Sequence, residues 1–583
     1  MTQNQSIRKN ITRDNIILLL SIIGLTVCIA VLFPQVRQLI MDLVEQYMHR
    51  KINFYQAWLK TLLFFAIGGI CFILFLDYFT LTNSGKEIAH KVKRDMKASL
   101  TEIDFRSFRK PVLIMSCIYL LGILTVIRAN FLFEDDIKYA VSGFREWYNW
   151  SRYVIVFLSY FIQPEINITD ISPIPQLLAA LVLAVSSVLL VYIINDRKIT
   201  TVGLLASVPL GLSPFFLECL AYKFAAIYFT LSIFVCIVPF LFLAHKKVFF
   251  FCSVICLLIM CMIYQAASGI YLLLVIILCS QDWNYRKKPV KELLSFLGIA
   301  VLAFCLALLV YKFFLMRPVS YYASNEMLPI SQIIPGLLSN MKTYSTFINQ
   351  NLSLLWKVGI ILVFMLFIIK STYQSEQNKL FAFLVSISVI SISFFASYGV
   401  FFLLIKPLYA ARAMLGFGVF LSILCVYVVS NFKKFAAIPV LALNWCFFVF
   451  AFSYGNALAD QARYAEFRIG MLLHDLSILY PEHKGEDLSI QLQNKIDYTP
   501  LVKNIAYHNP IIEYLVPPRL QDVRIFDNLY YLEYFNFGTY QMVHYQNDIN
   551  DKDAFTENLP VVLDSYYHTI KSDGSHVLII LKH

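Results

Sequence analysis

Long apolar runs dominate this chain, and they decide what it can fold into. A helix of about twenty apolar residues crosses the hydrocarbon core of a bilayer and satisfies its own backbone hydrogen bonds. Runs near this length recur between Asn15 and Phe452, and short connectors separate them. The pattern predicts a mainly α, polytopic membrane helical bundle with about thirteen transmembrane helices.

Composition supports the same class of protein. Hydrophobic residues make up 59% of the 583 residues, whereas soluble proteins have an apolar share of about 45–50%. The net charge of +11 comes from basic clusters in the connectors, as membrane topology requires, so we expect membrane lipids as partners and no nucleic acid. The twelve cysteines lie in or beside apolar runs without metal-ligand spacing, and we interpret them as packing residues.

The basic connectors set the predicted orientation. Residues 8–13 and 86–110 are strongly basic, which places the N-terminus and the second connector in the cytoplasm. Alternation then leaves the C-terminal region outside. Residues 248–280 allow either one long tilted helix or two short helices broken at Gln265, and we favour two because one span would move every later basic connector outside. The predicted spans are 15–33, 58–81, 112–127, 177–194, 201–217, 221–244, 248–263, 267–280, 293–314, 354–369, 380–403, 410–429 and 436–452.

Three regions follow from this pattern. Residues 1–109 form a two-helix extension with an interfacial helix and a basic cytoplasmic loop, and residues 110–454 form the transmembrane core. Residues 455–583 are predicted to form a small α+β domain outside the cytoplasm. In that domain Ala457–Leu479 has helical periodicity, residues 487–493 alternate as a strand does, and residues 561–582 read as a hairpin.

The acidic triplet Glu134, Asp135 and Asp136 is the candidate reaction centre. It follows the apolar run 112–127 by a few residues, so it should leave the bilayer at the outer surface. Carboxylates at that depth can meet the headgroup of a lipid-borne substrate. A short acidic loop after a span can also be no more than a solvated connector.

Other external connectors contribute groups of opposite charge. A guanidinium forms paired hydrogen bonds to phosphate and an ammonium acts as a point charge, although both also snorkel from helix ends to the interface. Tyr264 and Gln265 interrupt an apolar run, and a buried amide needs a partner or a cavity. The external residues singled out are Glu218, Tyr222, Lys223, Arg317, Lys406 and Arg412.

Several of these residues form motifs that resemble the bacterial O-antigen-modifying glucosyltransferases, which are integral membrane enzymes of GT-C type. The stretch Ser213–Phe224 (SPFFLECLAYKF) and the triplet Tyr264-Gln265-Ala266 also match that family, and the likeness covers 112–455. Ser151 stands where the family has glycine, and Ala225 stands where an acidic residue is expected. The matching residues of the first external loop are Asp135, Asp136, Gly143, Trp147 and Arg152.

The resemblance implies a GT-C fold and transfer of glucose from a polyprenyl-phosphate donor to a lipid-linked or surface polysaccharide. The reaction would occur on the periplasmic face of the bacterial cytoplasmic membrane. Asp135 or Asp136 would act as general base, with Glu134 beside them. The donor phosphate would be bound by Arg152, Arg317, Lys406 or Arg412. The candidate substrate contacts are Trp147, Glu218, Tyr222, Lys223, Tyr264 and Gln265.

No cofactor is expected. Adjacent carboxylates could hold a divalent metal ion, but a donor with a single phosphate carries less charge than a nucleotide diphosphate, so metal-free catalysis is favoured.

Two alternative functions stay open at this point. One is a translocator that moves a polyprenyl-linked sugar without chemistry, and the other is a GT-C transferase for another sugar or a cell-wall polymer.

Overall fold

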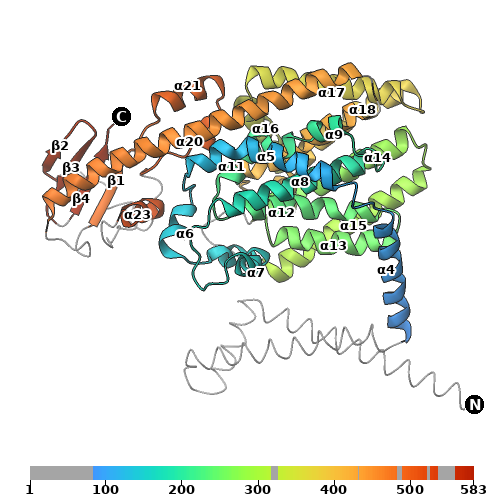
Figure 1. Cartoon of the computed structure of the whole chain (residues 1–583), viewed down its shortest axis with the longest axis horizontal. Coiled ribbons are helices and arrows are strands. Elements are labelled where there is room, and N and C mark those ends of the chain that lie inside the picture. Colours follow the sequence, from blue (N-terminus) through green and yellow to red (C-terminus); the bar gives the residue numbers. More distant parts are fainter. Residues whose placement is uncertain are drawn as a thin grey trace, which may run out of the picture.

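A computed structural model describes residues 83–316, 326–430, 432, 434–481, 489–521, 525–535, 559–574 and 576–582. The predicted spans 15–33 and 58–81, and Arg317, lie outside these residues. The described chain forms a helical bundle, and a small domain with a β-sheet lies at one end of it, beside the second half of helix α20 (Figure 1).

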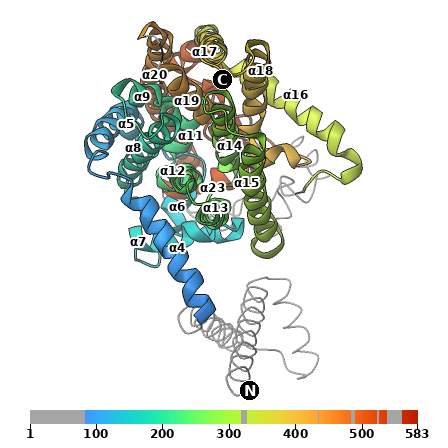
Figure 2. The same cartoon turned by 90° about the vertical axis from the view of Figure 1, so that its right-hand side faces the viewer.

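Eight helices in the described residues are long and apolar enough to cross a membrane. Figure 2 shows α19 near the centre of the bundle and α15 at its edge. In agreement with these positions, 89% of the apolar stretch that contains α19 is buried, compared with 17% of the stretch that contains α15. Short helical turns directly extend α14, α15, α19 and α20. The eight helices are α5 (Arg109–Ala129), α8 (Ile174–Ile194), α14 (Ser268–Asn284), α15 (Val290–Val310), α17 (Leu354–Tyr373), α18 (Lys379–Ala396), α19 (Leu415–Val429) and α20 (Ala437–Leu479).

Three predicted spans correspond to shorter or broken helices. The run 201–217 is a bent pair, the run 221–244 contains α12 (Ala226–Ile237) followed by a 3-10 turn (Val238–Phe242), and the run 248–263 forms α13 (Lys246–Cys261). Helical structure stops at Cys261 and resumes at Gln265, so the preference for two helices in this region is confirmed. The short apolar helix α7 (Tyr153–Ile162) was not among the predicted elements.

Prolines explain the bent pair. Helices α9 (Thr201–Ala206) and α10 (Pro209–Leu212) run into α11 (Pro214–Ala221) with a bend of 62°. Proline lacks a backbone N–H and is favoured at the start of a helix, so a new helix begins at each proline. The bend turns α11 so that Glu218 lies close to the start of α19.

The connectors gather in two groups. Arg197 pairs with Glu102 at 2.6 Å, Lys287 pairs with Glu376 at 3.1 Å, and Arg286 pairs with Asp196. These contacts join the connectors that were predicted to be cytoplasmic, at the end of the bundle that carries α4 (Asn83–Thr101) (Figure 1). The acidic triplet lies at the opposite end. The four connectors that these pairs join therefore gather at the end of the described bundle opposite to the acidic triplet.

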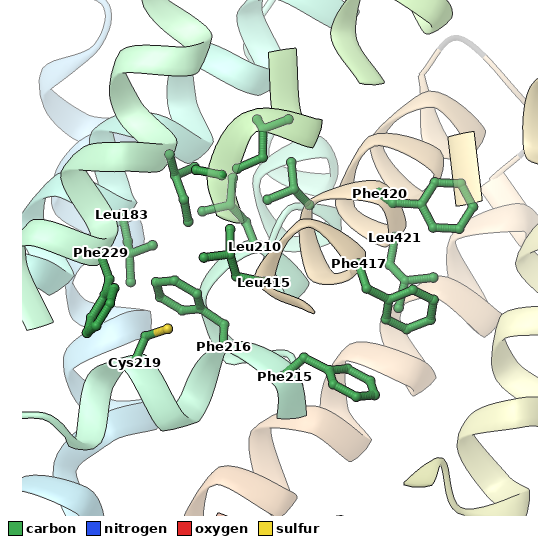
Figure 3. Close-up of a cluster of buried hydrophobic side chains, with 14 of the residues drawn as sticks. Leu183, Leu210, Phe215, Phe216, Cys219, Phe229, Leu415, Phe417, Phe420 and Leu421 are labelled. Carbon is green, nitrogen blue, oxygen red and sulfur yellow. The ribbon is translucent and has the colours of Figure 1, made fainter. Parts of the chain in front are cut away.

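An apolar core lies behind the acidic end of the bundle. Phe215 and Phe216 of α11 are fully buried, and Phe215 meets Phe417 of α19 edge-to-face with ring centroids 5.3 Å apart (Figure 3). Lipid is as apolar as these side chains, so the helices are held together by close packing rather than by expulsion of water. The packing fixes α11, which carries Glu218, against α19. The 3-10 turn Ala411–Met414, which leads into α19, carries Arg412.

The C-terminal domain contains a four-stranded sheet in the order β1-β4-β3-β2. Strand β1 (Ser489–Gln493) runs parallel to β4 (His576–Leu581), and β3 (His568–Ser572) is antiparallel to both β4 and β2 (Val561–Asp564). The predicted hairpin is confirmed as β3 and β4. The predicted helix Ala457–Leu479 is part of α20, so the last span continues without a break into this domain. Its described residues also form three short helices: α21 (Pro500–His508), α22 (Ile512–Leu515) and α23 (Ile525–Tyr534).

We predict that Gly416→Val will prevent normal packing of α19. A Cβ atom at Gly416 would lie 2.1 Å from the carbonyl oxygen of Ser397, which is backbone and cannot move aside. Gly298 of α15 has no atom within 4 Å of such a Cβ, so Gly298→Val is the matched control. Size-exclusion profiles and thermal aggregation in detergent should show loss of folded protein for Gly416→Val alone. Equal stability of the two variants would contradict this packing.

Candidate active site

Backbone geometry shapes the acidic loop. Helix α5 ends at Ala129, and the short helix α6 (Asp136–Ser142) begins six residues after Asn130. Gly143 ends α6 in the left-handed conformation, with φ of 68°, where a Cβ would lie 2.9 Å from Asn167. Ser151 also has a left-handed φ of 58°. Glycine, which the resembled family has at the position of Ser151, adopts such a φ without strain. For a residue with a Cβ atom, the same conformation costs about 1 kcal/mol.

Asp136 is fully buried and holds two connectors together. Its carboxylate accepts hydrogen bonds from the backbone N–H groups of Phe133 at 3.0 Å, Lys223 at 2.8 Å and Phe224 at 3.3 Å. Burial raises the pKa of Asp136 to about 7, although the three N–H donors oppose the shift. The side chain joins the acidic loop to the turn after α11, and its oxygens are occupied.

Glu134 belongs to a buried ion network. Its carboxylate accepts a hydrogen bond from the Tyr222 hydroxyl at 2.8 Å and pairs with Nη1 of Arg412 at 3.1 Å. The same Nη1 lies 2.5 Å from Glu218, whose second oxygen accepts the Arg412 backbone N–H at 2.6 Å. Three connectors that are far apart in the sequence therefore meet at Arg412, whose charge is balanced by two carboxylates.

Asp135 differs from both neighbours because its side chain is exposed. Among the residues that the structure describes, no group donates a hydrogen bond to its carboxylate. Protein surrounds the group closely enough to raise its pKa by desolvation, and Glu134 raises it further, while Arg412, Arg152 and Lys138 act in the opposite direction. An accessible carboxylate with a raised pKa can accept a proton from a substrate hydroxyl.

Arg152 supplies a cation whose charge is not balanced in the same way. It precedes α7, and its guanidinium carbon lies 5.4 Å from the ring centre of Tyr264. In the described part of the chain no carboxylate forms an ion pair with Arg152. The Tyr264 hydroxyl is buried and makes no hydrogen bond there either. The guanidinium acts electrostatically on Asp135, and both it and the Tyr264 hydroxyl can donate to a substrate phosphate.

The remaining predicted residues are placed differently. Lys406 is exposed and has no contact with the network in the described residues. Trp147 is buried against Tyr139, with ring centroids 5.0 Å apart. Gln265 bonds the Cys261 carbonyl at 2.8 Å and the Tyr311 hydroxyl at 2.5 Å, and so joins the broken helix to the end of α15.

Lys223 has partners that the sequence did not reveal. Its ammonium donates to Asn130 at 2.7 Å and pairs with Asp170. Asp170 lies in the connector before α8, for which the sequence offered no motif. Hydrophobicity and charge spacing give no signal for such a pair, because it depends on how two connectors fold over one another.

The C-terminal domain packs directly on the acidic loop. The guanidinium carbon of Arg519 lies 3.8 Å from the ring centre of Phe131 and 4.7 Å from that of Tyr531 in α23. Ile137 of α6 belongs to the apolar core of the domain, together with Leu472 of α20. Figure 1 shows α6 and α23 near one another at this end of the bundle. The domain therefore supports the segment that contains Asp135.

No group of three or more His, Cys, Asp or Glu side chains within the described ranges is arranged to hold a metal ion. The acidic triplet itself is divided among three environments. Its oxygens face backbone amides, an arginine and solvent, so they do not converge on one point. This arrangement does not suit an ion held between adjacent carboxylates.

Comparisons with known proteins agree with these motifs. The family model for glucosyl transferase GtrII matches residues 124–423, which include the acidic loop and Arg412. An uncharacterized 55.3 kDa protein in the gtrB 5′ region of Salmonella phage P22 is 23% identical over 404 residues, covering 66% of this chain and 82% of the phage protein. No solved structure matches the chain.

We predict that Asp136→Asn destabilises the protein more than Asp135→Asn. Both oxygens of Asp136 accept backbone N–H groups, and an amide has only one acceptor oxygen, so its NH₂ group would face at least one of these donors. An unsatisfied buried donor costs about 1–3 kcal/mol, whereas Asp135 makes no such bond. Thermal unfolding in detergent should show a lower midpoint for Asp136→Asn and an unchanged midpoint for Asp135→Asn. The reverse order would contradict the assignment of Asp136 to a structural position.

Proposed function

This chain belongs to the glucosyl transferase GtrII family and is a membrane glycosyltransferase, and from this premise we propose that it moves glucose from a polyprenyl-phosphate donor to a lipid-linked or surface polysaccharide. The observation that supports this most directly is the pair formed by an exposed Asp135 and a guanidinium, Arg152, without a carboxylate partner in the described residues. The first can accept a proton, and the second can bind a phosphate.

We place the reaction on the periplasmic face of the bacterial cytoplasmic membrane. Basic connectors remain in the cytoplasm, and those of this chain meet at the end of the bundle opposite to Asp135. The acidic loop, α11 and the start of α19 are at the other end. A polyprenyl-phosphate sugar presented on the outer surface would bring its phosphate to that depth.

The proposed reaction assigns a separate step to each group. Asp135 takes the proton of the acceptor hydroxyl, whose oxygen attacks the anomeric carbon of glucose. The bond from that carbon to the phosphate oxygen breaks, and polyprenyl phosphate leaves with the bonding electrons. Arg152 stabilises the negative charge that develops on the phosphate. Arg412 holds Glu134 and Glu218 in place beside this site.

Membrane vesicles test this proposal against its two alternatives. Vesicles that contain the protein are given labelled polyprenyl-phosphate glucose and polysaccharide. A glucosyltransferase yields a new glycosidic product, whereas a translocator changes the sidedness of the labelled lipid and yields none. Parallel assays with other polyprenyl-phosphate sugars would reveal a transferase for a different sugar or for a cell-wall polymer. Absence of any glycosidic product would refute the proposed function.

We predict that Asp135→Asn lowers the transfer rate by about 10²–10⁴-fold, since asparagine keeps the shape of the side chain and removes its basicity. Donor binding and folding should be retained. Glu165→Gln, which neutralises an exposed carboxylate in the next connector, is the matched control. Turnover near that of the unaltered protein in Asp135→Asn would exclude this residue as the base.

The pH profile provides a second readout for Asp135. A base acts in its ionised form, and the pKa of Asp135 is raised from the usual value of 3.8. The transfer rate should therefore fall as the pH drops through a value above 3.8. The residual activity of Asp135→Asn should lack this acidic limb. An acidic limb that survives the substitution would point to another titrating group.

We predict that Arg152→Ala raises the KM for the donor, and that Arg152→Lys raises it less because the charge is retained without the planar fork. Loss of a charge-assisted hydrogen bond of about 1.5–3 kcal/mol corresponds to about a 10–100-fold change. Arg128→Ala is a suitable control. Arg128 is an exposed arginine in the last turn of α5, and its side chain donates a hydrogen bond to Asn456. Unchanged donor KM in Arg152→Ala would remove this residue from the phosphate site.

A further inference from the structure

A cavity lies beside the acidic loop, next to the turn that follows α11. The space between its walls is about 380 Å³ when the part that opens to solvent is included. The last turn of α5, the first turn of α8, the end of α11 and Leu458 of α20 form its walls. All of these elements reach it from the end of the bundle where Asp135 lies. The cavity is therefore on the face where the polysaccharide has to approach.

One buried polar group in this cavity lacks a partner. Gln176, in the first turn of α8, is 3% exposed, and its Oε1 atom is buried without a hydrogen bond in the described residues. Buried acceptors in native proteins are normally satisfied, and an unsatisfied one calls for a bound donor. Lys223 adds a partly used donor, since its ammonium has three protons and two of them are directed at Asn130 and Asp170.

The charge of the cavity indicates what it can bind. The buried Lys223 ammonium, 4% exposed, already pairs with the carboxylate of Asp170, so an anion would find no unbalanced cation here. Phe131, Val126, Ile127 and Leu458 add apolar surface. A neutral ligand with both hydroxyl groups and an apolar face fits this lining, and a sugar ring has both features. A phosphate does not.

The turn that follows α11 separates the cavity from the proposed donor site. Tyr222 donates its hydroxyl to Glu134 on one side, while the next residue, Lys223, extends its side chain into the cavity. Asp136 holds this turn through the Lys223 backbone N–H. The two sites are thus adjacent and share one wall.

We infer that the cavity is a subsite for a sugar residue of the acceptor polysaccharide, next to the residue that receives glucose. This inference rests on the proposed glucosyltransferase function. A hydroxyl of the sugar donates to Oε1 of Gln176, and another accepts a hydrogen bond from the Lys223 ammonium. The subsite explains how a chain of similar sugar units can be held in one register against Asp135.

The first test replaces Gln176 by leucine, which has nearly the same volume and no acceptor. Transfer is measured with the full-length protein in membrane vesicles, using purified polysaccharide and polyprenyl-phosphate glucose. The KM for polysaccharide should rise about tenfold, as expected for one lost hydrogen bond to a buried polar group, while the KM for the donor should not change. A rise in the donor KM instead, or no change in either, would overturn the subsite.

A second pair of variants keeps the test decisive if Gln176→Leu fails to fold. Ser172 lines the cavity, so Ser172→Trp should obstruct it and raise the KM for polysaccharide. Thr169→Trp places the same side chain at an exposed position in the same connector outside the lining, and should behave like the unaltered protein. Equal effects of the two tryptophans on the polysaccharide KM would refute the subsite.

The subsite and the proposed function fail in different ways. If the unaltered protein makes no glycosidic product from polyprenyl-phosphate glucose, the proposed function fails whatever the variants do. If the unaltered protein transfers glucose and Gln176→Leu and Ser172→Trp retain its KM for polysaccharide, the proposed function stands and only the subsite is wrong.

Discussion

The ion network around Arg412 is the interaction on which the outer end of the molecule depends. Glu218 is 2% exposed and Glu134 is 11% exposed, so each would be costly to bury without a partner. Arg412 neutralises both and also fixes its own backbone to Glu218. Removal of the arginine would leave two carboxylates close together in a poorly solvated place. The network therefore determines how the acidic loop, α11 and α19 meet.

This arrangement gives three neighbouring acidic residues three different functions. Glu134 is used by the network and Asp136 by backbone amides, which leaves Asp135 accessible. Adjacent carboxylates that all faced one small space would raise one another's pKa, and their separation leaves one carboxylate of the triplet, that of Asp135, exposed. The loop is further supported from outside the bundle, where Arg519 and α23 pack on Phe131 and α6.

Helix α20 links the membrane bundle to the C-terminal domain. It runs from Ala437 to Leu479 without interruption, so the last apolar run and the helix predicted after it are one rigid element. The prediction separated them because hydropathy falls after Ser453. Backbone hydrogen bonding along a helix does not depend on hydropathy, and a helix can leave the bilayer and continue in water.

The sequence by itself determined the class of protein, most of the helical runs in the described chain and the family motifs around the acidic triplet. Those features depend on local hydrophobicity, charge and spacing, which one chain displays without its neighbours. Tertiary structure decided which acidic residue is accessible, that Lys223 pairs with Asp170, and that Arg412, unlike Arg152, pairs with carboxylates in the described residues. Each of these findings depends on burial and on partners about 50 to 280 residues away in the sequence. The spacing of nearby residues reveals neither the burial nor such distant partners.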